Sequence, residues 1–193
     1  MNAIFQFPTY LLRRQAIALT GKFRFYDPAG RMVMFSEQKM FRLREDIRVY
    51  SDESKSQEVL SIMARQFMDF SAAYDVVDTA LNQKVGVLRR KGLRSLLRDE
   101  WEVLDASDNV IGQLFEDSVG LALLRRLLLG TWLPQNYDLT VGGTRVADLR
   151  QNFNPFRYEL NLDFSMDTAR QLDRRVGIAA GILLAAVEGK QSS

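Results

Sequence analysis

The sequence predicts a mainly β protein, an antiparallel barrel closed around a hydrophobic C-terminal helix, with one short helix outside it. Two observations predict this fold. Strand-turn-strand units recur along most of the chain, and residues 176–187 read VGIAAGILLAAV, a stretch without a charge. About eleven short strands joined as hairpins would leave exposed edges unless the sheet closed on itself. A closed sheet also gives the apolar helix a lumen to fill.

The hairpins share one pattern. Tyr74–Leu88 and Trp101–Leu114 each begin with an aromatic residue, reach an aspartate four residues later, and resume with Val or Ile before a glycine. Polar turn residues separate the two halves of each unit, as expected for antiparallel hairpins. The same shape recurs at 23–35, 47–62 and 137–149, and 157–164 adds one more strand.

Two helices are expected. The C-terminal helix, approximately 166–189, is apolar on every side and shorter than the ~20 apolar residues that span a bilayer. We expect Ser165 to be its N-cap, with Asp167 in its first turn. The segment 118–130, SVGLALLRRLLLG, predicts an amphipathic helix on the barrel exterior, and a membrane-surface helix is the alternative.

Composition excludes several kinds of chemistry. The chain of 193 residues has no cysteine and no histidine, which excludes disulfides, thiolate nucleophiles, Ser-His-Asp catalysis and histidine metal sites. Its length predicts a single domain, 1–193. No basic-apolar leader pattern precedes residue 15, so we expect a cytoplasmic protein.

Charge is distributed in blocks although the net charge is only +2. Residues 83–98 carry six basic and no acidic side chains, and residues 99–120 carry seven acidic and no basic ones. The blocks either neutralise each other across a hairpin, the favoured interpretation, or leave a basic patch that meets anionic lipid. The candidate head-group-binding residues of that patch are Arg89, Arg90, Lys91, Arg94 and Arg98.

The repeated aromatic-x-x-x-Asp hairpins and the closing segment YELNLDFSMDTARQLDRRVGIAAGILLAAVEG resemble the phospholipid scramblase and LURP-one-related families, which share the Tubby C-terminal-like fold. This resemblance implies a closed barrel of about twelve antiparallel strands around a central hydrophobic helix. It also implies lipid scrambling or phosphoinositide binding as candidate activities. Scramblases carry an acidic calcium-binding segment before the last helix. Here that stretch has only Asp163, Asp167 and Asp173, among arginines, so we expect no metal.

These observations predict a non-enzymatic protein that binds anionic phospholipid or phosphoinositide head groups peripherally at a membrane. The alternatives are a soluble regulatory or small-ligand-binding scaffold, with Trp132 and Tyr137 as candidate contact residues, and a membrane-inserted scramblase. An enzyme using the clustered carboxylates of Glu100, Glu102, Asp105 and Asp108 is the weakest hypothesis. We expect a monomer with no cofactor and no nucleic-acid partner, and the sequence leaves any protein partner unknown.

Overall fold

The computed structural model describes residues 2–15, 20–39, 46–65, 72–91, 100–117, 134–152, 154 and 157–188. These residues form a closed barrel of twelve antiparallel strands with one α-helix and a short 3-10 helix, η1 (Ala3–Phe5). The predicted mainly β fold and the closed antiparallel barrel are therefore confirmed. The predicted helix at 118–130 and Trp132 lie outside the described residues.

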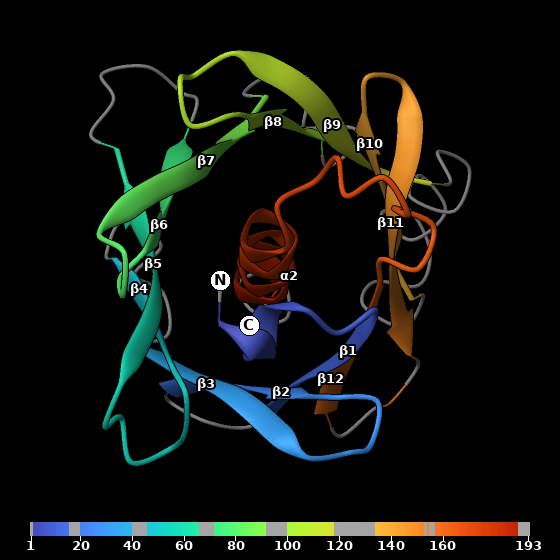
Figure 1. Ribbon diagram of the computed structural model, residues 1–193. Helices are drawn as coiled ribbons and strands as arrows, with labels where there is room; N and C mark the ends of the chain where they lie inside the picture. The colour runs from blue at the N-terminus through green and yellow to red at the C-terminus, as the bar shows by residue number, and fades with distance from the viewer. Residues whose placement is uncertain are drawn as a thin grey trace.

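The strands follow one another around the barrel in sequence order, and β1 completes the ring by pairing with β12 (Figure 1). Each neighbouring pair is antiparallel, as hairpin connections require. The bounds are β1 Thr9–Gln15, β2 Thr20–Tyr26, β3 Met32–Lys39, β4 Ile47–Tyr50, β5 Glu58–Ala64, β6 Ala73–Asp78, β7 Gln83–Arg90, β8 Glu100–Leu104, β9 Val110–Glu116, β10 Asn136–Val141, β11 Thr144–Asn152 and β12 Arg157–Asp163.

Strand β1 is the one that the hairpin pattern did not predict. Its sequence, TYLLRRQ, breaks the apolar-polar alternation that marks a half-buried strand. The break arises because Arg14 points inward: its side chain is buried and its guanidinium carbon lies 5.4 Å from the centroid of the Tyr158 ring. The ring thus offers this inward cation a cation–π contact.

Helix α2 (Arg174–Glu188) runs through the ring of strands, as Figure 1 shows looking along the barrel. Residues 176–185 are buried, and they form one apolar core with the inward side chains of the strands. Two glycines set the distance between the helix and the wall. A β-carbon added at Gly181 would lie 2.8 Å from Leu162 Cδ2, and one at Gly177 would meet the Phe164 ring. The small residues therefore allow close approach of helix and wall.

The helix begins later than predicted, at Arg174 rather than near residue 166. Asp167 does not sit in a first helical turn, because its carboxylate accepts the backbone N–H groups of Gln171 and Leu172. Arg170 has a φ of +51°, which interrupts right-handed helix. Asp173 caps the helix instead of Ser165: its Oδ1 accepts the N–H of Arg175 at 3.0 Å.

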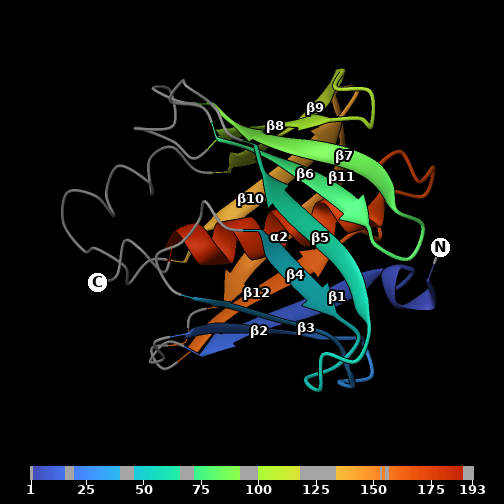
Figure 2. The same ribbon diagram turned by 90° about the vertical axis from the view of Figure 1, so that its left-hand side faces the viewer.

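The two ends of the barrel are built differently. One end, here called the turn end, holds η1, the start of α2, and the connections 27–31, 51–57, 79–82, 105–109 and 142–143. In Figure 2 the turn end is on the right, with η1 beside the N-terminus. At the opposite end, here called the far end, the odd-numbered strands and α2 finish.

Candidate functional site

Two members of the predicted basic patch form ion pairs on the outer face of β7 and β8. Arg89 pairs in register with Glu102, and its guanidinium lies 2.7 Å from Glu102 Oε2. Lys91 Nζ lies 2.5 Å from Glu100 Oε1. The basic and acidic blocks thus neutralise each other at these two pairs, which was the favoured interpretation of the sequence. The pairs also occupy two carboxylates that were considered as acid-base groups.

Arg90 lies on the other face of the wall. Residues two apart in a strand point to the same face, so the Arg90 side chain points inward like that of buried Leu88. Its guanidinium carbon is 6.0 Å from the centroid of the Trp101 ring, which is itself buried beside Tyr74. The predicted patch is therefore split at Arg90, and its remaining members, Arg94 and Arg98, lie outside the described residues.

The connections at the two ends of the barrel differ sharply in composition. The five hairpin connections of the turn end read DPAGR, SDESKSQ, TALN, DASDN and GG, with five acidic residues, two basic residues and no aromatic residue. The segments that join the far ends of the strands have the opposite character. The five that follow β1, β3, β5, β7 and β9 contain the stretches AIAL, MFRLRE, QFMDFS, GLRSLLRD and SVGLALLRRLLLGTWL, with six arginines against three acidic residues and many large apolar residues. Their placement is outside the described residues, but the strand ends that they join are described.

A groove of about 470 Å³ lies on the outer wall of the barrel, over β1 and beside the turn that follows β2. Thr9, Leu11 and Arg13 face outward there, since Tyr10 and Leu12 between them are buried in the core. The register places Tyr26 of β2 and Asn161 of β12 on either side of Leu11. The residues that line the groove are Thr9, Tyr10, Leu11, Arg13, Tyr26, Asp27, Pro28, Gly30, Asn161, Leu162 and Asp163.

The acidic residues before α2 serve as backbone acceptors. Asp163 Oδ1 accepts the N–H of Ser165 at 2.8 Å, and Asp167 binds the two N–H groups already described. Asp173 caps α2 and pairs with Arg175. In the part of the chain that the structure describes, no group of three or more acidic side chains is placed to hold a metal ion.

A protein-family model described as LURP-one-related matches residues 32–185. The chain belongs to the LURP-one-related family. The predicted resemblance to LURP-one-related proteins is thereby confirmed. This LURP-one-related match begins at β3 and ends within α2, so the part of the groove that β1, β2 and the turn at 27–31 supply precedes it. No curated protein and no solved structure matches the chain significantly.

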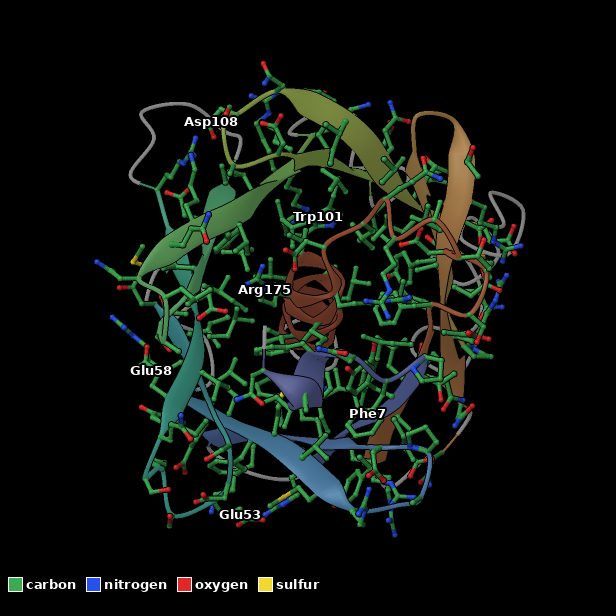
Figure 3. The ribbon with its side chains drawn as sticks, viewed as in Figure 1. Phe7, Glu53, Glu58, Trp101, Asp108 and Arg175 are labelled. Atoms are coloured by element: carbon green, nitrogen blue, oxygen red, sulfur yellow. The ribbon has the colours of Figure 1, made fainter. Side chains whose placement is uncertain are left out.

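An ion-pair cluster around Arg175, which Figure 3 labels beside α2, holds the start of the helix in this LURP-one-related barrel. Arg175 contacts Asp78 at the end of β6 at 2.5 Å and Asp173 at 2.6 Å. The hydrogen bonds that the Arg175 guanidinium donates to both carboxylates, that to Asp173 first, raise its pKa despite its burial. Arg174 differs: its guanidinium lies 4.7 Å from the centroid of the Phe164 ring, and burial lowers its pKa. The first turn of α2 is therefore held by the ion pairs of Arg175 and by the contact of Arg174 with Phe164.

Two further sequence expectations about this LURP-one-related chain concern surface and membrane contacts. Tyr137, considered as an exposed contact residue, is fully buried, and its hydroxyl donates to Gln135 Oε1. Among the described residues, none of the helices has the length and apolar character needed to cross a membrane. The groove had no signal in the sequence, because its walls come from segments more than 130 residues apart that meet only when the barrel closes.

Proposed function

We propose that this LURP-one-related protein is a non-enzymatic, monomeric module that binds anionic phospholipid head groups peripherally, with the far end of its barrel toward the membrane. The difference in composition between the two barrel ends carries the proposal. The far-end segments combine arginine with large apolar residues, whereas the turn-end connections are acidic and polar. An anionic membrane attracts the basic end of such a protein and repels the acidic end, so this charge asymmetry orients the barrel at the membrane.

The far-end segments have the chemistry that membrane-surface contact requires. Each Lys or Arg near an anionic surface contributes about 1 kcal/mol of attraction, and clusters of four to eight act together. Six arginines belong to these segments: Arg42, Arg44, Arg94, Arg98, Arg125 and Arg126. Their apolar neighbours supply the area that an interfacial segment buries among the acyl chains.

Arg89 and Lys91 have an auxiliary part in this proposal. Both lie near the far end of β7, and each is held by one carboxylate on the outer wall. The Arg89 side chain remains 40% exposed in its pair with Glu102. Because a surface ion pair is worth only about 0–1 kcal/mol, a lipid phosphate competes with the carboxylate at small cost. Arg94 and Arg98 follow in the sequence and lie outside the described residues.

Insertion of α2 into the bilayer, as in an integral scramblase, has less support. The apolar side chains of α2 pack against the barrel interior, and β12, β7, β6 and β1 all contact the helix. Removing the helix would expose this core to water, at about 25 cal/mol for each Å² of apolar surface. Peripheral contact leaves the barrel and its helix intact.

Flotation with liposomes tests this function. The purified protein is mixed with vesicles of phosphatidylcholine alone or of phosphatidylcholine with phosphatidylserine, each at low and at high salt. We expect flotation only with the anionic vesicles, and its loss in high salt, because screening shortens the reach of surface charges. Flotation that persists in high salt would favour insertion of α2. Absence of flotation at low salt would contradict membrane binding and leave a scaffold for soluble ligands.

A further inference from the structure

We propose that the groove over β1 binds a neutral sugar ring, a pyranose with its hydroxyl groups. The site is separate from the far end, and it does not depend on the membrane function. It combines an open groove of about 470 Å³, an apolar floor and several polar atoms that bond to none of the described residues. Small-ligand sites typically share these three properties.

The floor and one wall of the groove are apolar. Leu11 lies at the centre, with the Tyr26 ring beside it in register and Pro28 in the adjoining turn. The guanidinium of Arg13 lies 5.0 Å from the centroid of the Tyr26 ring, which fixes both side chains. A flat apolar surface next to a held aromatic ring suits the C–H face of a pyranose.

The polar atoms around this floor include both donors and acceptors. Asn161 donates to Asn152 Oδ1 at 2.9 Å, and its own Oδ1 accepts no hydrogen bond within the described residues. Asp163 uses Oδ1 for the N–H of Ser165 and leaves Oδ2 available. Arg13 uses Nε for Glu159 at 3.0 Å, and no hydrogen bond in the described part of the chain involves its Nη atoms.

Two hydroxyl groups complete the rim. Thr9 Oγ1 and the Tyr26 hydroxyl make no hydrogen bond to any described residue, and each can both donate and accept. A sugar hydroxyl has the same dual capacity. The rim therefore matches a ligand whose edge alternates donors and acceptors at short intervals, which a pyranose provides.

The charges of the groove argue against other ligand classes. The residues that line the groove carry one cation, Arg13, and two carboxylates, Asp27 and Asp163, so the groove has no net positive charge with which to attract a phosphate. An acyl chain would leave Asn161 and Asp163 desolvated without partners. The volume of about 470 Å³ suits one or two sugar rings rather than a macromolecule.

Saturation-transfer and amide-shift NMR on the full chain test this site. The probes are glucose, galactose, N-acetylglucosamine, maltose and lactose, with inorganic phosphate as the anionic comparison. We expect at least one sugar to shift amides of β1, of the turn at 27–31 and of β12 near Asn161, and phosphate to leave them unmoved. No shift with any sugar, or a stronger response to phosphate, would overturn the proposal.

Two variants distinguish sugar binding in the groove from non-specific sugar binding elsewhere on the protein. Leu11→Trp fills the floor while keeping a residue suited to a strand, so we expect the sugar response to be lost. Tyr26→Phe removes one rim hydroxyl and should weaken binding severalfold. Thr140→Trp, an outward position of β10 that does not line the groove, is the matched control. A sugar response that survives Leu11→Trp in a folded protein would overturn the assignment.

A pyranose reaches such a site either as a free sugar or as the head group of a glycolipid. Flotation with phosphatidylcholine vesicles that contain digalactosyl diacylglycerol distinguishes these sources. Glycolipid-dependent flotation that free lactose or galactose displaces, and that Leu11→Trp abolishes, assigns a lipid-borne sugar. Sugar shifts in NMR without such flotation assign a free one. Both results support the groove as a sugar site, whereas flotation unaffected by Leu11→Trp speaks against it.

Discussion

Arg175 of α2 and Asp78 of β6 form a buried ion pair that joins residues 97 positions apart in the chain. The two side chains are only 9% and 4% exposed, and their atoms approach to 2.5 Å. The second oxygen of Asp78 accepts the N–H of Leu81 in the turn that follows. One carboxylate therefore ties the start of the helix to the β6–β7 hairpin.

Arg175→Met should destabilise the barrel strongly. It leaves the Asp78 carboxylate buried without its cation, and breaking a buried pair in this way costs about 3–5 kcal/mol. Urea unfolding followed by circular dichroism measures the loss. Arg89→Met is the control, since its exposed pair with Glu102 is worth less than about 1 kcal/mol. Equal losses in the two variants would contradict the role given to Arg175.

Gly181→Ala should destabilise the packing of α2, although alanine favours helices. The added methyl group would lie 2.8 Å from Leu162 Cδ2, and overpacking of a core costs about 1–3 kcal/mol. Leu162→Ala opens space at the same contact. In a double-mutant cycle measured by urea unfolding, we expect the two losses to be less than additive. Strict additivity would mean that the two residues are not in contact.

Tyr10 should ionise well above the usual range of a phenol. Burial raises the pKa of its hydroxyl to about 12, although the N–H of Phe7 bonds to it and lowers the value in part. Because the pKa is raised in the folded state, burial of the neutral Tyr10 side chain stabilises the fold. This contribution is complete below about pH 10 and is lost as the pH rises through about 12. The pKa of Tyr10 is measured by ultraviolet pH titration of the wild type and of Tyr10→Phe, as the difference between the two curves. A difference signal centred near pH 10 would disprove this burial.

Arg90→Gln should separate stability from membrane binding. Its guanidinium lies over buried Trp101, a contact worth about 0.5–2 kcal/mol, so we expect a lower unfolding free energy. Vesicle flotation should stay unchanged in the folded variant, because Arg90 does not share the outer face with Arg89. The double variant Arg89→Gln, Lys91→Gln should show the reverse: nearly unchanged stability and weaker flotation. Weaker flotation caused by Arg90→Gln alone would contradict the split of the patch.

The hairpins could be predicted because their turns are local. In the first of them, Asp27 accepts the N–H groups of Ala29 and Arg31, and Gly30 has a φ of +76°. These features follow from a few adjacent residues, and antiparallel order follows from short turns. Closure could be inferred too, since the alternative was a sheet with two open edges.

What could not be predicted depends on residues that meet only in the closed barrel. Strand β1 was missed because inward Arg14 breaks its alternation, and the Tyr158 ring beneath Arg14 is 144 positions away. The start of α2 was misplaced because Asp167 bonds ahead to Gln171 and Leu172 rather than opening a helix. The groove could not be predicted from the sequence for the same reason as β1, because Asn161 and Leu11 become neighbours only when β12 pairs with β1.

The most direct test of membrane binding through the far end compares flotation of two charge variants matched in number. Arg94→Gln with Arg98→Gln removes two cations from a far-end segment, and Lys55→Gln with Arg170→Gln removes two from the turn end. With vesicles containing phosphatidylserine, we expect the far-end variant to bind roughly 30-fold more weakly, since two cations contribute about 2 kcal/mol. The turn-end variant should bind like the wild type. Equal weakening of both variants, or loss in the turn-end variant alone, would contradict the proposed orientation.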